Sequence, residues 1–141
     1  MGLLDGFSEY SKVGRYYTSR ISISNSGWIS FNSTSYRDLK LNKYQFAKFF
    51  FNTSNRNIGI KFMINNEEGS YEMKPRLYNN GKDKALYMPI KGFVQSNKIV
   101  PEDKKYIRYS VKGTEQGEEI LVVILEPKKE GGNIKENEES L

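Results

Sequence analysis

The side chains of this sequence that could do chemistry are aromatic rings and cationic groups, and they gather between residues 20 and 64. Most of them share one face of alternating, strand-like segments, and one lies at a turn. Nucleic-acid bases stack on aromatic rings for roughly 1–3 kcal/mol each, while Lys and Arg side chains hold phosphates. We therefore predict a nucleic-acid-binding face made of Arg20, Trp28, Phe46, Lys48, Phe50, Arg56 and Lys61.

Most catalytic chemistries lack the residues they need. The sequence has no cysteine and no histidine, which removes thiolate nucleophiles, imidazole bases and zinc sites built from these residues. No glycine-rich phosphate loop of the dinucleotide or nucleotide-hydrolase type occurs. The adjacent glutamates lie in predicted loops or in the C-terminal stretch, where we interpret them as solvated. We expect a non-enzymatic protein with no cofactor and no metal.

The charge is positive and unevenly distributed. The formal net charge is +5, with 19 Lys and Arg against 13 Asp and Glu in residues 1–126, and 3 against 4 in residues 127–141. A basic fold suits a polyanionic partner such as DNA or RNA, because phosphates release counterions on binding. No segment approaches the ~20 apolar residues of a membrane span. We expect a cytoplasmic protein of a bacterial or phage-infected cell, with no membrane partner.

The hydrophobic pattern predicts antiparallel hairpins. Period-two alternation separated by turn residues is typical of half-buried strands joined by tight turns. A helical turn capped by Ser33 or Asn32 is expected through Leu39, and a second short helix is expected to begin at Pro89. The predicted strands are 21–25, 28–32, 44–51, 58–64, 71–78, 85–88, 105–111 and 119–126.

These segments predict an α+β fold, an antiparallel sheet of hairpins with about eight strands and one or two short helices. Pro75 is expected at an edge or strand end, since proline donates no ladder hydrogen bond. The last strand is apolar on both faces and should be central or covered. We expect an N-terminal arm or short helix in residues 1–19, one β-rich domain in 20–126, and a disordered Glu-rich tail in 127–141 that offers a site for a protein partner.

The aromatic strand 44–51 has two interpretations. Phe46, Lys48 and Phe50 share one face, while Ala47 and Phe49 share the other. The face can be open to bind a ligand, or it can be buried under another element or a second subunit. For Trp28, burial and ligand contact are equally compatible with its place beside a turn.

Two families resemble residues 21–64. The run I-S-I-S-N-S-G-W-I-S-F-N, the short turn ending at Leu39 and Leu41, and the later I-G-I-K-F are similar to the Positive Cofactor Four/Whirly single-stranded-DNA-binding fold of bacterial and phage proteins. The segment 89–98 resembles a short helix of that fold. This resemblance implies a curved sheet, assembly into dimers or larger oligomers, and DNA bound at Trp28, Phe46, Lys48, Phe50 and Lys61.

The same stretch is similar to AbrB-type swapped-hairpin regulators, which bind duplex DNA as dimers. Asn32-Ser33 replaces the proline usual after the second strand, and the first hairpin carries serines where basic residues are expected. The sequence therefore favours a homo-oligomeric protein that binds single-stranded DNA or RNA in replication, recombination or transcription. The alternatives are a structural or assembly protein, a virion or accessory component that uses its aromatic sheet face for subunit contacts, and an AbrB-like duplex-DNA regulator.

Overall fold

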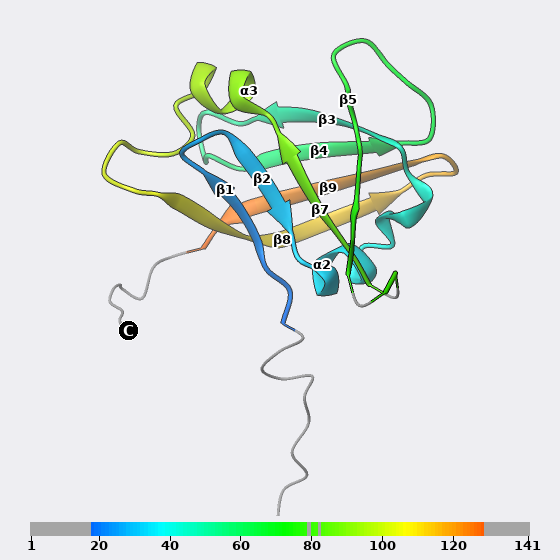
Figure 1. Ribbon diagram of the computed structural model, residues 1–141. Coiled ribbons are helices and arrows are strands. Elements are labelled where there is room, and N and C mark those ends of the chain that lie inside the picture. The colour runs from blue at the N-terminus through cyan, green and yellow to red at the C-terminus, as the bar shows by residue number, and fades with distance from the viewer. Residues whose placement is uncertain (1–17, 79, 82, 129–141) are drawn as a thin grey trace, which may run out of the picture.

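The sheet curls into a half-barrel around the hydrophobic core. The computed structural model describes residues 18–78, 80–81 and 83–128, and within these ranges nine strands form one antiparallel sheet (Figure 1). The spatial order is β5-β3-β4-β9-β8-β1-β2-β7-β6. The strands are β1 (Ile21–Ser24), β2 (Trp28–Phe31), β3 (Phe46–Phe51), β4 (Ile58–Met63), β5 (Tyr71–Glu72), β6 (Arg76–Tyr78), β7 (Asp83–Pro89), β8 (Tyr106–Gln116) and β9 (Ile120–Pro127).

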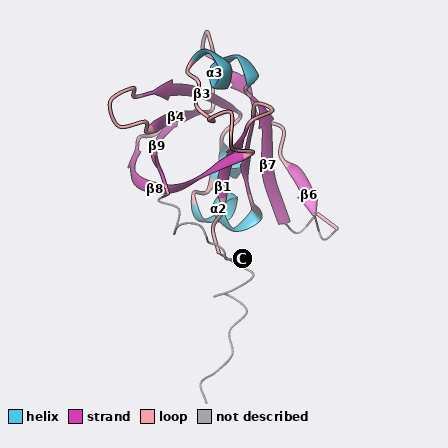
Figure 2. Ribbon diagram, turned by 90° about the vertical axis from the view of Figure 1, so that its left-hand side faces the viewer, coloured by secondary structure: helices cyan, strands magenta, loops and turns pink. Residues whose placement is uncertain are grey.

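The predicted fold class is confirmed, with nine described strands instead of about eight. Two short α-helices, α2 (Ser33–Asp38) and α3 (Lys91–Ser96), and a 3₁₀ turn, η1 (Leu41–Lys43), accompany the sheet. Figure 2 shows the strands curling round, with α3 above and α2 below. The helices therefore close the two ends of the half-barrel, where the sheet alone would leave the core open.

Strand β8 belongs to both halves of the sheet. Its first residues, Tyr106–Tyr109, pair with β1, and its residues from Tyr109 to Gln116 pair with β9, with a register shift between Val111 and Gly113. A bulge bends a strand and increases its twist. One half of the sheet is β6-β7-β2-β1 with the start of β8, and the other is the end of β8 with β9-β4-β3-β5.

The core fills the inner, concave side of the sheet. Alternate residues of each strand point inward, so the predicted period-two pattern becomes a continuous apolar layer. Phe31 and Phe62 come from opposite halves and meet edge to face, with ring centres 6.0 Å apart. Phe93 of α3 packs on Phe49 of β3 at 5.7 Å. Ring packing between halves therefore replaces part of the aliphatic core that this aromatic-rich sequence lacks.

The first helix begins where the sequence predicts. Asn32 is the N-cap, and its Oδ1 accepts a hydrogen bond of 3.0 Å from the backbone N–H of Ser35. The same oxygen accepts the backbone N–H of Arg20 at 3.0 Å, and the Asn32 Nδ2 donates to the carbonyl of Thr18. One side chain thus caps α2 and fixes the start of β1.

Three hairpins are confirmed, and β9 is central. β1 pairs with β2, β3 with β4, and β8 with β9. The apolar strand β9 lies between β4 and β8, as its two apolar faces predict. Hairpin pairing needs only contacts between neighbouring segments, so it can be predicted from local alternation and turn residues.

The predicted strand 71–78 is wrong as a single element. Its first part is β5, which pairs with β3, and its last part is β6, which pairs with β7 at the opposite edge of the sheet. Between them the backbone N–H of Met73 donates to the carbonyl of Gln45, and Pro75 immediately precedes β6. Because Pro75 offers no N–H, the chain leaves one edge there and crosses to the other.

Two boundaries also differ from the prediction. Pro89 ends β7, pairing with Trp28, and α3 begins later with Ile90 as its N-cap residue. β8 continues to Gln116, through residues predicted to be a loop, because the bulge accommodates Gly113 while the ladder to β9 continues.

The predicted N-terminal arm and Glu-rich tail lie largely outside the described residues, which end at Lys128. Within those residues, none of the helices has the length and apolar character required to span a bilayer.

Candidate nucleic-acid interface

A row of polar side chains crosses the outer face of the β8-β1-β2-β7 half. Arg108 is directly opposite Ser22, Ser22 opposite Ser30, and Ser30 opposite Tyr87. Side chains of directly opposite residues lie about 4.5–5.5 Å apart at Cβ. The two serine hydroxyls contact each other at 3.0 Å. These hydroxyls keep lone pairs, and one hydrogen of the pair, available for a ligand.

Two further arginines join this row and form a groove. Arg20 precedes β1 and lies across from Asn32, whose hydrogen bond holds its backbone, while Arg76 comes from β6. The cavity has a volume of about 460 Å³. We call it the arginine groove, and its polar lining is Arg20, Ser22, Ser30, Asn32, Arg76, Tyr87 and Arg108.

The groove is positively charged, and the described residues provide its arginines with no salt-bridge partner. Among the residues that the structure describes, no carboxylate forms a salt bridge with Arg20, Arg76 or Arg108. Within the described strands of this half, Asp83 of β7 and Glu126 of β9 place carboxylates at the margins of the same face. Three guanidinium groups around one groove are therefore available to an anionic ligand.

Aromatic rings brace two of the arginines. The ring of Tyr87 stacks on Trp28 with centres 4.6 Å apart and planes 19° apart, and the guanidinium carbon of Arg76 lies 5.0 Å from the Tyr87 ring centre. Arg108 lies over Tyr106 in the same way, at 5.3 Å. When a guanidinium group lies over an aromatic ring, its N–H donors still point outward in the guanidinium plane and can bond a phosphate. Tyr87 and Tyr106 are 40% and 47% exposed, and because the Tyr87 ring already contacts Trp28 and Arg76, Tyr106 is the ring more open to a base.

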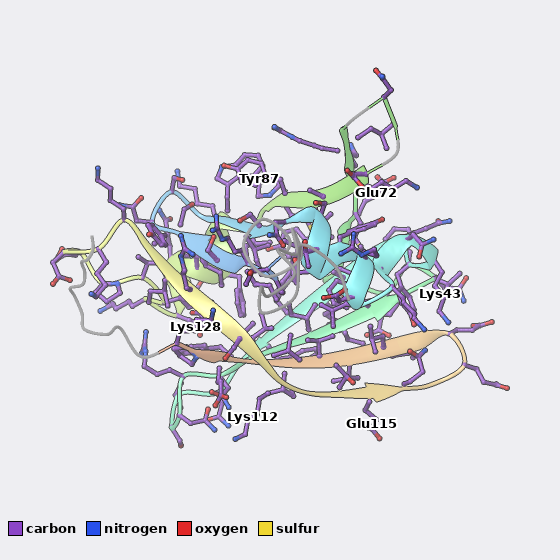
Figure 3. All side chains as sticks on the ribbon, turned by 90° about the horizontal axis from the view of Figure 1, so that it is seen from below. Lys43, Glu72, Tyr87, Lys112, Glu115 and Lys128 are labelled. Carbon is purple, nitrogen blue, oxygen red and sulfur yellow. The ribbon has the colours of Figure 1, made fainter. Side chains whose placement is uncertain are left out.

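The structure does not bring the seven sequence-predicted residues together. Arg20 and Trp28 lie on the arginine-groove half of the sheet. Phe46, Lys48, Phe50 and Lys61 lie on β3 and β4, and strands β9 and β8 separate β4 from β1. Figure 3 shows Tyr87 on the upper side of the molecule and the far half of β8, with Lys112 and Glu115, on the lower side. The expectation of one platform built from the first four strands is wrong, because the C-terminal hairpin inserts between the two N-terminal ones.

The two lysines of the predicted site are already paired. Lys48 Nζ contacts Glu67 Oε1 at 3.1 Å, and Lys61 Nζ contacts Glu67 Oε2 at 3.0 Å. On the same face, Phe50 is 50% exposed and Phe46 is half-buried. The predicted alternation of this strand is therefore correct, but its cations contact a loop of the protein itself.

Arg56, in the β3–β4 turn, connects this turn to the segment after α3. Its backbone has a φ of 63°, and its Nη2 donates to the carbonyls of Lys98 and Ile99 at 2.9 and 3.1 Å. The guanidinium carbon lies 5.2 Å from the centre of the Phe51 ring. This side chain therefore fastens the turn to the segment after α3, away from the arginine groove.

Sequence reasoning missed Arg76, Tyr87, Tyr106 and Arg108. The run Y-I-R-Y places Tyr106 and Arg108 on one strand face, which is a usable local signal. Their place beside Ser22 and Ser24 depends on the long-range pairing of β8 with β1, which no local pattern encodes.

No group of three or more metal-ligating side chains occurs among the described residues. Comparison of the chain with protein-family models, curated proteins and solved structures found no match.

Proposed function

We propose that this protein binds single-stranded nucleic acid, DNA or RNA, on the outer face of the β8-β1-β2-β7-β6 half, without catalysing a reaction on it. The observation that carries the proposal is the arginine groove, where three arginines without salt-bridge partners among the described residues surround two serine hydroxyls. Backbone phosphates would occupy the groove, and charge-assisted bonds from planar guanidinium groups suit them.

The exposed rings beside the groove favour a single strand over a duplex. Tyr87 and Tyr106 lie on either side of the Ser22–Ser30 pair, each with an arginine over its ring. Bases can reach such rings only when they are unpaired, and stacking on them tolerates any base. The groove would therefore bind the backbone while a neighbouring base stacks on Tyr106, the more exposed of the two rings.

The test is fluorescence anisotropy of labelled single-stranded and duplex oligonucleotides at several salt concentrations. If each groove arginine neutralises one phosphate of a single strand, the slope of log K against log salt is roughly −2 from these three contacts. Replacing all three groove arginines with glutamine should abolish that part of the slope and weaken binding roughly 30- to 100-fold.

A matched control removes the same charge elsewhere. Arg37, Lys43 and Lys112 are exposed and lie outside the groove, so their triple glutamine variant should retain most of the affinity. Trp28 is the single tryptophan and stacks on Tyr87, so ligand binding in the groove should change its fluorescence. Equal weakening in both triple variants, or tighter binding of duplex, would overturn the proposal.

A second candidate function is assembly through the other half of the sheet. The outer faces of β3 and β9 carry an apolar strip, interrupted by Lys48 of β3 and by Lys61 of the intervening β4, in which Phe50 is the most exposed member. The strip consists of Phe46, Phe50, Ile120, Val122 and Ile124. Exposed apolar patches of this kind are typical of protein interfaces. Light scattering would show a dimer or larger oligomer that Phe50→Glu dissociates, and a monomer at all concentrations would refute this candidate.

A further inference from the structure

Lys48 and Lys61 form a like-charge pair on the outer face of β3 and β4. They are directly opposite each other in the antiparallel register, and each is half-buried. Like charges in this position repel and destabilise the strand pair. An anion between the two ammonium groups would therefore stabilise the strand pair.

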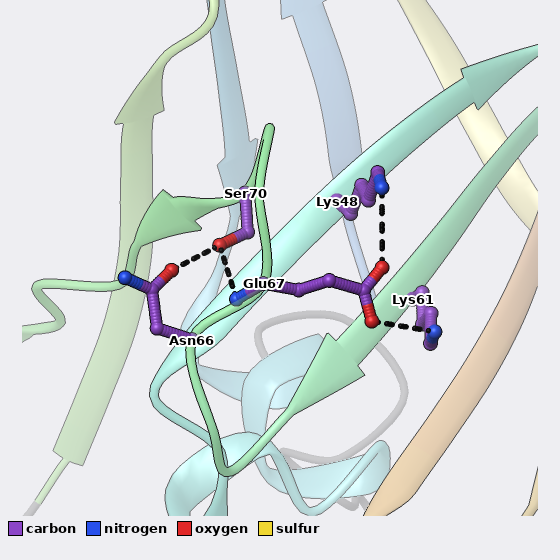
Figure 4. Close-up of polar contacts among 5 residues, drawn as sticks. All are labelled: Lys48, Lys61, Asn66, Glu67 and Ser70. Carbon is purple, nitrogen blue, oxygen red and sulfur yellow. Dashed lines mark hydrogen bonds and ion pairs between the residues drawn. The ribbon is translucent and has the colours of Figure 1, made fainter.

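Glu67 supplies that anion from the loop after β4. Figure 4 shows its carboxylate between the two lysines, one oxygen bonded to each. The hydrogen bond from Lys61, followed by that from Lys48, lowers the pKa of the Glu67 carboxyl below its usual value. One carboxylate thus satisfies both cations with its two oxygens.

The loop that carries Glu67 is held mainly by its own short-range bonds. The Ser70 hydroxyl donates to Asn66 Oδ1 at 2.8 Å and accepts the backbone N–H of Glu67 at 3.3 Å (Figure 4). The Glu67 side chain remains 41% exposed. Salt bridges at this exposure are weak and screened by salt, so another anion can compete for the lysines.

We propose that Lys48 and Lys61 form a second phosphate-binding site, which Glu67 occupies in the free protein and a nucleic-acid phosphate takes in its place. A phosphodiester matches the carboxylate, since it carries one negative charge and two non-bridging oxygens. Phe46 and Phe50 flank Lys48 on the same strand face, where they can stack bases next to that phosphate. The ligand class rests on the proposed function, whereas the location on β3 and β4 is independent of the arginine groove.

The experiment compares Glu67→Gln with Glu68→Gln in anisotropy titrations with a single-stranded oligonucleotide. Glu68 is exposed and forms no salt bridge with the described residues, so the two variants change the net charge equally. Only Glu67→Gln removes the competing anion. It should bind roughly three- to tenfold more tightly than Glu68→Gln at low salt, with a slope steeper by about 0.7 for one added phosphate.

Adding Lys48→Gln and Lys61→Gln to Glu67→Gln should remove this gain. The proposal is overturned if Glu67→Gln and Glu68→Gln bind equally, or if the gain survives loss of the lysines. Glu67→Ala serves as a second variant, and thermal melts confirm that each variant is folded.

The two proposals fail separately. Wild-type binding that depends on the groove arginines, with no difference between the two glutamine variants, rejects only the second site. Binding by Glu67→Gln that persists without those arginines but needs both lysines rejects only the groove. No binding by any variant rejects both proposals.

Discussion

Replacing Arg56 tests whether this residue stabilises the fold or binds nucleic acid. Its long side chain reaches from the β3–β4 turn to the carbonyls of Lys98 and Ile99, and the Ile99 side chain is fully buried. We expect Arg56→Met, which keeps an apolar stem but removes every donor, to destabilise the fold. Its affinity for an oligonucleotide should fall no more than that of a variant that loses one positive charge far from the groove.

The magnitude follows from the contacts. A hydrogen bond from a charged donor contributes about 1.5–3 kcal/mol, and the low end applies here because one of the two bonds is exposed. The contact with the Phe51 ring adds about 0.5–1 kcal/mol. The expected loss is therefore about 2 kcal/mol in the free energy of unfolding. At about 3–5 °C per kcal/mol for a domain of this size, the melting temperature should fall by about 6–10 °C.

Urea denaturation followed by far-UV circular dichroism measures this loss. Arg37→Met is the control, because Arg37 is exposed and makes a single long ion pair of 3.9 Å with Asp38. That variant should stay within about 0.5 kcal/mol of wild type. An Arg56→Met protein as stable as Arg37→Met would refute the structural role. Weaker oligonucleotide binding by Arg56→Met than by Arg37→Met would indicate that Arg56 contacts nucleic acid, as the sequence predicts.

Three further predictions concern the fold. Gly27 has a φ of +91°, and an added Cβ would lie 2.6 Å from the Lys91 Cα, so Gly27→Ala should cost about 3 kcal/mol or more in a urea titration. Gly81→Ala, at a φ of +86° with open space around it, should cost only about 1–2 kcal/mol, and equal losses would contradict the clash. Gly92→Ala lies in α3 with nothing near the added methyl and should gain up to about 1 kcal/mol, measured as a higher melting temperature. Tyr109 is 3% exposed, and burial raises the pKa of its phenol to about 12. The unfolded chain deprotonates first, near pH 10, so stability should fall by about 2–3 kcal/mol between pH 10 and 12, and Tyr109→Phe should remove that fall.

The sequence by itself determined the local elements and the two faces of each strand. Alternation in 21–25 and 28–32 indicated the first hairpin, Ser33 or Asn32 indicated the start of a helix, and the apolar segment 119–126 indicated a central or covered strand. The hairpin and the start of the helix depend on contacts between residues close in the chain. Turn residues and the period of side-chain burial record such contacts directly.

Only the tertiary structure decided which strands lie next to each other in the sheet, and so which of their side chains share a surface. Backbone ladder hydrogen bonds are the same for every sequence, so the pairing of β8 with β1 and of β9 with β4 follows from how the whole core packs. That pairing separated Trp28 from Lys48 and placed Arg108 beside Ser22. The positions of Glu67 between two lysines and of Arg56 on the Ile99 carbonyl likewise result from long-range folding, because long side chains take the partners that the packed backbone brings within their reach.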